Sequence, residues 1–122
     1  MMLNWSDLDT ENLIEEHGDW LALADGEIVE YAAKSVRDFF IFTDRRLIIA
    51  DVQGLVRKKT EYQSIPYRSI SRWSAESKGK GLFDGADLKV WLGANSEPTF
   101  EVELKKDKSA ADIMTLLSTH AL

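Results

Sequence analysis

Residues 39–50 read FFIFTDRRLIIA, and this stretch decides the fold class. Four aromatic or β-branched residues come first, a polar Thr-Asp-Arg-Arg segment follows, and four apolar residues complete the stretch. Aromatic and β-branched runs favour strands, and a short polar segment between two such runs favours a hairpin. The stretch therefore predicts a β-hairpin over residues 38–51, with a tight turn at residues 43–46.

Further strand patterns lie on both sides of this hairpin. Strands are predicted over residues 28–36, 56–65 and 71–77, with Trp73 as the buried member of the last. Apolar residues then alternate with other residues in two segments, which is the period of half-buried antiparallel strands. The alternating residues are Leu88, Val90 and Leu92, followed by Phe100, Val102 and Leu104.

The predicted strand at 56–65 differs from the others in its composition. Apart from Tyr62, its interior from Arg57 to Ser64 is polar on both faces. A strand with so little to bury is not expected between two packed layers, so it should lie at a sheet edge or project from the sheet.

A helix is predicted at each end of the chain. Ser6, followed by Asp7 and Asp9, favours a helix start, and Gly18 favours its end. Ser109 and Asp112 form a capping box for the second helix. One apolar face follows at helical spacing and should close one end of the sheet structure. Its members are Ala110, Ile113, Met114, Leu117 and Ala121.

These elements predict a mostly β, α+β fold in a single domain. A chain of 122 residues is one domain by length, divided here into an N-terminal helical segment at 1–26 and a β domain at 27–122. About seven strands and a C-terminal helix leave a two-sheet sandwich or a partly open barrel as the simplest architectures. Because the N-terminus lacks a signal-peptide pattern and the chain has no cysteine, we expect a cytoplasmic protein.

The charge is distributed unevenly along the chain. The net charge of −6 argues against nucleic-acid binding, which favours a basic domain. Residues 1–30 carry nine acids and no lysine or arginine, whereas residues 31–80 carry eleven bases and five acids. These segments could attract each other within one chain or between neighbouring chains, or the asymmetry has no function.

The sequence shows no catalytic constellation, so we expect neither an enzyme nor a bound metal or cofactor. His17 and His120 lie near opposite ends and favour surface positions. Glu101 and Glu103 share one strand face, which the alternation predicts to be solvated. Gly79, Gly81 and Gly85 lack the Gly-Lys-Ser/Thr ending of a phosphate loop, so a flexible hairpin loop explains them better.

The segment Arg57-Lys58-Lys59 is open to three interpretations. It protects an exposed strand edge from aggregation, it pairs with an acidic partner, or it attracts anionic lipid headgroups. Three bases on an acidic protein attract a membrane weakly, so the lipid interpretation ranks last.

Several segments together resemble the bacterial pleckstrin-homology (PH) domain family, long classed as a domain of unknown function. The resemblance begins at Asp25-Gly26-Glu27 and is concentrated in a block of motifs from Phe42 to Ile70. These motifs are Phe42-Thr43-Asp44-Arg45-Arg46-Leu47-Ile48, Asp51-Val52-Gln53-Gly54, Lys58-Lys59-Thr60-Glu61-Tyr62 and Ser64-Ile65-Pro66-Tyr67-Arg68-Ser69-Ile70.

The resemblance implies a PH-like barrel of two orthogonal antiparallel sheets with about seven strands and a C-terminal helix. It also implies a cyclic homo-oligomer, with a pentamer favoured, that mediates protein–protein interaction without catalysis. Eukaryotic relatives that bind phosphoinositides use bases around the first hairpin loop. The corresponding bases here, Lys34 and Arg37, are candidates for an anionic ligand.

The polar strand is the predicted interaction surface. A ring needs two different surfaces that meet on neighbouring copies, and an unburied edge strand can add to a neighbouring sheet. One alternative is a peripheral module that binds anionic lipid through Arg45, Arg46, Arg57, Lys58 and Lys59. The other is an enzyme site built across subunits. The predicted oligomer surface consists of Arg45, Arg46, Arg57, Lys58, Lys59, Glu61, Tyr62 and Gln63.

Overall fold

The computed structural model describes residues 2–4, 6–7, 17–34, 38–54, 56, 59–79, 81, 85–104 and 109–122. At 2–4, 6–7, 34 and 109 the backbone alone is described. The chain divides into two compact units, Asp7–Pro66 in one and Met1–Ser6 with Tyr67–Leu122 in the other.

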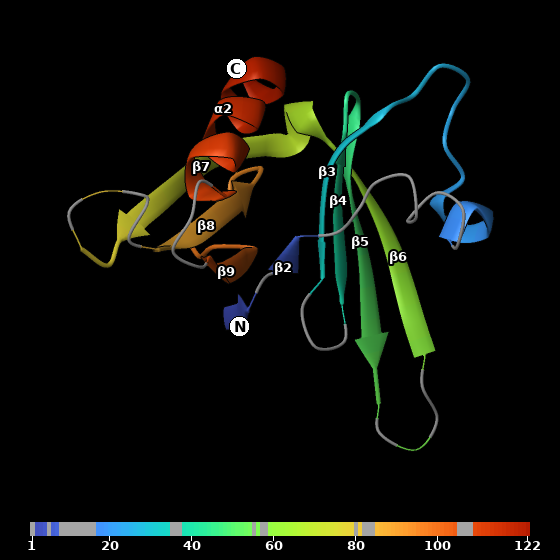
Figure 1. Cartoon of the computed structure of the whole chain (residues 1–122), viewed down its shortest axis with the longest axis horizontal. Coiled ribbons are helices and arrows are strands. Elements are labelled where there is room, and N and C mark those ends of the chain that lie inside the picture. Colours follow the sequence, from blue (N-terminus) through green and yellow to red (C-terminus); the bar gives the residue numbers. More distant parts are fainter. Residues whose placement is uncertain are drawn as a thin grey trace. The chain divides into compact units, whose positions relative to one another are not determined.

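The first unit is built on a five-stranded sheet in the order β2-β3-β4-β5-β6. The predicted hairpin is confirmed, because β4 and β5 pair antiparallel with Phe40 opposite Ile49 and Phe42 opposite Leu47. Strands β3 to β6 lie side by side in chain order (Figure 1). The strands are β2 (Ser6–Asp7), β3 (Val29–Lys34), β4 (Phe39–Thr43), β5 (Arg46–Gln53) and β6 (Lys59–Pro66).

Both faces of this sheet bury apolar side chains. On one face Ile41 and Ile48 pack in a cluster with Leu21, and Trp20 lies against it. On the opposite face Phe40, Phe42, Leu47 and Ile49 are buried as well. Burial on both faces explains why the hairpin lacks strict apolar–polar alternation.

The polar strand lies at the sheet edge, as the sequence predicts. Strand β6 is the last strand in the sheet order, and most of its side chains from Lys59 to Ser64 are exposed or half-buried. Ile65, near its end, is the buried member. A terminal position needs little apolar surface, which is consistent with this composition.

The second unit contains a four-stranded sheet in the order β1-β9-β8-β7. Strands β7, β8 and β9 are antiparallel neighbours, whereas β1 runs parallel to β9. Leu88, Val90, Val102 and Leu104 are buried as their alternation predicts. The strands are β1 (Met2–Asn4), β7 (Ile70–Ser77), β8 (Ala86–Leu92) and β9 (Phe100–Leu104), with the 3-10 helix η1 (Tyr67–Ser69) before β7.

The C-terminal helix α2 (Ser109–Ala121) belongs to the same unit and packs against β7 and η1. Of the predicted face, Ala110, Ile113 and Leu117 are fully buried, and Met114 and Ala121 are half-buried. Figure 1 shows this helix beside β7. The ring of His120 stacks on Tyr67 of η1 with ring centres 5.0 Å apart.

Three details predicted from the sequence differ from the structure. Helical structure is present at residues 17–21, but Ser6 and Asp7 form β2 and Gly18 lies inside the helical stretch. Ser6 therefore satisfies backbone groups in a sheet rather than capping a helix. Trp73 is only half-buried, and Trp91 of the adjacent strand is buried instead.

Candidate functional site

The family-like motif around Asp25-Gly26-Glu27 forms a turn that leads into β3. Gly26 has a φ of 76°, a left-handed conformation that glycine adopts without the cost of a side chain. The backbone N–H of Glu27 donates to the carbonyl of Ala24 at 3.0 Å, and its carboxylate accepts from the Ala24 N–H at 2.9 Å. The Glu27 side chain is only 1% exposed, so its charge needs partners inside the protein.

Arg46, at the start of β5, supplies the positive charge. Its Nε donates to Oε2 of Glu27 at 2.9 Å and one terminal nitrogen donates to Oε1 at 3.1 Å, a two-point contact that suits a guanidinium. The same terminal nitrogen donates to the carbonyl of Ala22 at 2.9 Å, and the other reaches Oγ of Ser64 on β6 at 2.6 Å. Arg46 thereby links the segment before β3 to the edge strand.

Thr43 completes the group at the end of β4. Its hydroxyl donates to Oε2 of Glu27 at 2.6 Å and accepts from the backbone N–H groups of Arg45 and Arg46. We call Glu27, Thr43 and Arg46 the Glu27 clasp. The polar residues of the predicted 43–46 turn thus cap the turn and hold the buried carboxylate.

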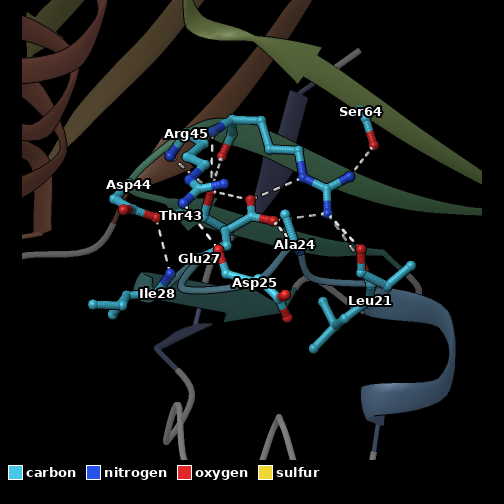
Figure 2. Close-up of polar contacts among 11 residues, drawn as sticks. Leu21, Ala24, Asp25, Glu27, Ile28, Thr43, Asp44, Arg45 and Ser64 are labelled. Carbon is cyan, nitrogen blue, oxygen red and sulfur yellow. Dashed lines mark hydrogen bonds and ion pairs between the residues drawn. The ribbon is translucent and has the colours of Figure 1, made fainter.

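The two remaining residues of this turn reinforce the same junction. Asp44 accepts from the N–H of Ile28 at 2.9 Å, and its own N–H donates to the Ile28 carbonyl. Arg45 is exposed and donates to the carbonyl of Asp25 at 3.0 Å (Figure 2). The turn therefore contacts the segment before β3 at several points.

The clasp controls the protonation of Glu27. Burial by itself would raise the pKa of Glu27, but hydrogen bonds from Arg46, Thr43 and the Ala24 N–H, together with the charge of Arg46, lower it to about 2. A carboxylate held ionised by a bidentate arginine is a poor proton donor or acceptor near neutral pH. The arrangement is therefore suited to holding segments together rather than to acid–base chemistry.

The edge strand β6 carries the described part of the predicted interaction surface. Lys59, Glu61 and Tyr62 are exposed, and Gln63 is half-buried. Glu61 stands opposite Asp51 of β5, which places two acids side by side in the sheet. Gln63 donates to Glu61, and Gln53 donates to Asp51 at 3.2 Å. Like charges directly opposite each other are unfavourable, so this pair would gain from a basic partner.

Tyr62 lies on the opposite face of β6 and is 52% exposed. Its ring stacks on Trp20 with ring centres 5.1 Å apart, and Trp20 also contacts Phe39 of β4 and His17. The Trp20 indole N–H donates to Nδ1 of His17 at 3.1 Å. The Tyr62 ring therefore has a partner on one side and solvent on the other.

The structure separates the predicted basic residues. Arg46 belongs to the Glu27 clasp and Arg45 to the same turn, whereas Lys59 is exposed at the start of β6. Arg57, Lys58 and Arg37 lie outside the described residues, as does the side chain of Lys34. The sequence offered one signal for the clasp that the prediction did not use, namely a Glu and an Arg that both belong to family-like motifs.

The predicted solvated face of Glu101 and Glu103 contains a small ion-pair group. Lys78 contacts Glu103 at 2.6 Å and Asp87 at 3.5 Å. The hydrogen bond to Glu103 raises the pKa of Lys78, and the carboxylate charges contribute. All three side chains are partly open to solvent. A surface ion-pair group of this kind describes them better than a pair of catalytic acids.

In the described ranges, no three His, Cys, Asp or Glu side chains are grouped so that they could hold a metal ion. Within the same part of the chain, no helix has the length and apolar character needed to cross a membrane.

Comparison with known proteins gives consistent matches over nearly the whole chain. The Bacillus subtilis (strain 168) protein YjqA is 46% identical over 115 residues, covering 94% of this chain and 90% of YjqA. YozO from the same organism is 31% identical over 98 residues, covering 80% of this chain and 82% of YozO.

Solved structures agree with these sequence matches. A DUF1696-family protein with a pleckstrin-homology domain from Shewanella loihica PV-4 is 32% identical, with a TM-score of 0.79 and 98% of each chain covered. A pleckstrin-homology domain from Shewanella amazonensis SB2B is 37% identical, with a TM-score of 0.68 and coverage of 96% of this chain and 91% of that one. The family model for the bacterial PH domain matches residues 1–121. The predicted resemblance and the PH-like fold are thus confirmed, and the chain belongs to the bacterial PH domain family.

Proposed function

We propose that this chain is a non-catalytic PH-like module that assembles with copies of itself into a ring, a pentamer, and that the ring binds a further protein. The observation that carries the proposal is the exposed edge strand β6, which ends its sheet and carries few buried side chains. An edge strand offers unpaired backbone groups to another chain, and side chains on it set the choice of partner.

A ring requires that this edge meet a different surface on the next copy. The β6 surface has a mixed charge pattern that suits such a contact, with Lys59 at one end and the opposed acids Asp51 and Glu61 beside it. The half-exposed Tyr62 adds an aromatic side chain of the kind enriched at the centre of interfaces.

The lipid alternative has less support from the described residues. Of the bases assigned to it, Arg46 is committed to Glu27 and Arg45 donates to Asp25. Lys59 is exposed and has no acidic partner among the described side chains, but a single lysine attracts an anionic membrane weakly. Sedimentation with vesicles of anionic lipid at low salt tests this alternative, and binding there would favour it.

The test of the ring is the mass of the intact protein in solution. Light scattering and native mass spectrometry at micromolar concentration should give about five times the 13.8 kDa chain mass. A strict monomer would overturn the proposal. The variant Glu61→Arg should lower the mass, because it changes the charge pattern of the β6 edge.

A matched control uses the same chemical change elsewhere. Glu97 is exposed in the loop between β8 and β9, so Glu97→Arg should leave the mass unchanged. Equal loss of assembly in both variants would point to total charge rather than to the β6 edge. Once the mass is known, capture with wild-type and Glu61→Arg protein from the native cell would identify partners that depend on this surface.

A further inference from the structure

In the sheet of the second unit, β7 is the last strand in the order formed by the described residues. Strand β7 pairs antiparallel with β8 from Arg72 to Ser77, and the sheet order ends with it. On its other side, no strand among the described residues pairs with it. The register shifts between Ile70 and Arg72, so the regular part of the strand is Arg72–Ser77. This part contains neither proline nor lysine, two residues that commonly protect an edge.

Charges of opposite sign lie on one face of β7 without an oppositely charged partner in the described part of the chain. Arg72, Ser74 and Glu76 share a face because side chains alternate along a strand. Arg72 is exposed, and its guanidinium lies 3.9 Å from the ring centre of Trp91, with no acidic partner among the described residues. Glu76 is exposed opposite Asp87 of β8, an acid.

Arg72 and Glu76 cannot neutralise each other within the strand. Four residues of extended chain separate them by about 13 Å, which is too far for an ion pair. Neither residue therefore finds its counter-charge in the other residue of this strand. Their spacing around Ser74 is symmetric, because each lies two residues from it.

This symmetry matches a second copy of the same strand. If two β7 strands run antiparallel about a twofold axis at Ser74, Arg72 of each copy stands opposite Glu76 of the other. The same register places Trp73 opposite Ala75. Opposed charges in neighbouring strands are favourable, and the register forms two such pairs. A twofold axis at Arg72 or at Glu76 would instead place like charges opposite each other.

We propose that β7 pairs with β7 of a second copy of this chain, antiparallel and centred on Ser74. Such a contact uses the same surface on both partners, so it closes on two copies. It differs from the β6 contact of the proposed ring and does not depend on it. In a chain already assembled through β6, several β7 contacts would act together and strengthen one another.

Single cysteines test the register directly, because the chain has no cysteine of its own. Directly opposed Cβ atoms in antiparallel strands lie about 5 Å apart, close to the separation that a disulfide bridges. Ser74→Cys should therefore form a covalent dimer under mild oxidation, seen on a non-reducing gel and by intact mass. In Ser77→Cys the two cysteines lie about 20 Å apart, so this exposed variant is the matched control.

A second arm checks the pairing of different residues. A mixture of Arg72→Cys and Glu76→Cys proteins should cross-link to each other more than either does to itself, because the register places residue 72 opposite residue 76 and separates two copies of the same position by about 13 Å. Failure of Ser74→Cys to cross-link at concentrations where the chain associates would overturn the proposal. Equal cross-linking by Ser74→Cys and Ser77→Cys would overturn it as well.

Charge reversal tests the pairing without any covalent link. Arg72→Glu and Glu76→Arg should each weaken the association measured by sedimentation velocity about tenfold, because two attractive pairs become repulsive. The double variant Arg72→Glu/Glu76→Arg restores opposite charges and should recover the wild-type association. Thermal unfolding confirms that each variant is folded, and a double variant no stronger than the singles would contradict the proposal.

The β6 variant separates this proposal from the ring. In Glu61→Arg protein, Ser74→Cys should still cross-link if the β7 contact is independent. A dimer that cross-links through Ser74 and yet forms no ring would overturn the proposed ring and leave the β7 contact standing. If a ring forms that Arg72→Glu leaves unaffected, and Ser74→Cys does not cross-link, the β7 contact is overturned and the proposed ring stands.

Discussion

Glu27 carries a negative charge in a place where solvent reaches only 1% of its side chain. Three kinds of donor compensate for the lost water, namely the Arg46 guanidinium, the Thr43 hydroxyl and the Ala24 N–H. Arg46 also donates to the carbonyl of Ala22, whose φ of 49° is unfavourable for a residue with a side chain. At the scale of single residues, the Glu27 clasp holds an unusual backbone in place.

Acid should destabilise the protein through Glu27. Its pKa of about 2 in the folded protein lies below the ordinary value of 4.5, so its contribution to stability is full above pH 4.5 and is lost as the pH falls toward 2. A shift of this size corresponds to roughly 3 kcal/mol in the free energy of unfolding. Urea unfolding of wild type and Glu27→Gln between pH 7 and pH 2 measures this loss of stability.

The Glu27→Gln variant supplies the contrast for that experiment. It should be less stable than wild type at pH 7, because Arg46 loses the charge of its partner. Its stability should then fall less steeply below pH 4.5. Parallel pH profiles for the two proteins would show that Glu27 is not the titrating group.

Replacement of Arg46 by lysine should also destabilise the protein. Lysine keeps the charge but cannot contact Glu27 at two points while also reaching Ala22 and Ser64. We expect a loss of about 2 kcal/mol in the free energy of unfolding. Arg45→Lys is the matched control, because Arg45 is exposed and should change stability by less than about 0.5 kcal/mol.

The edge strands and the C-terminal helix differ in what they bury. Strand β6 exposes most of its polar side chains, whereas α2 buries Ala110, Ile113 and Leu117 against its own unit. The hydrophobic effect therefore fixes α2 strongly, and β6 is left with surface available for another chain. The element that buries apolar side chains in its own unit is thus distinct from the element that the proposed ring would use.

Removal of one acid from β6 should stabilise the chain slightly. Glu61→Gln removes the repulsion with Asp51 and should raise the free energy of unfolding by about 0.5 kcal/mol. Denaturant unfolding at low and high salt measures the gain, which should shrink as salt screens the wild-type repulsion. A loss of stability would show that Glu61 has a favourable partner that outweighs Asp51.

The helix should be sensitive to changes on its buried face. Ile113→Ala should cost about 3 kcal/mol, because it leaves a cavity where a fully buried side chain was packed. Thr115→Ala changes an exposed position of the same helix and should have an effect below about 0.5 kcal/mol. Urea unfolding of the two variants and of wild type measures both losses in the free energy of unfolding.

For the whole molecule, the charge is concentrated by segment rather than spread evenly. Residues 1–30 carry nine acids without a lysine or arginine, and residues 31–80 carry an excess of bases. Within the first unit, Arg46 and Glu27 bring one residue of each segment together. In the proposed ring, segments of opposite charge would steer one copy toward another.

The proposed assembly should survive moderate salt. Backbone pairing at an edge strand is screened little by salt, while steering between exposed charges is screened strongly. Between 50 and 300 mM salt, roughly, we expect the assembled mass to stay constant and the rate of assembly to fall. Complete dissociation in this range would show that surface charge, rather than edge pairing, holds the copies together.

Local pattern in the sequence determined most of the fold. The FFIFTDRRLIIA hairpin, the edge position of β6, the alternating strands β8 and β9 and the buried face of α2 all follow from periodicity or composition over a few residues. The same motifs carried the family resemblance. These features were predictable because each depends on neighbours that are close in the chain.

The tertiary structure alone decided which distant residues meet. Glu27 and Arg46 are 19 residues apart, and the motifs that contain them do not by themselves indicate which acid pairs with which base. Ser6 is of a residue type that favours helix caps, but it pairs in a sheet. The edge position of β7 is known only from the strand order. Periodicity reports how one segment divides its faces between core and solvent, whereas contacts between segments depend on how the whole chain closes around its core.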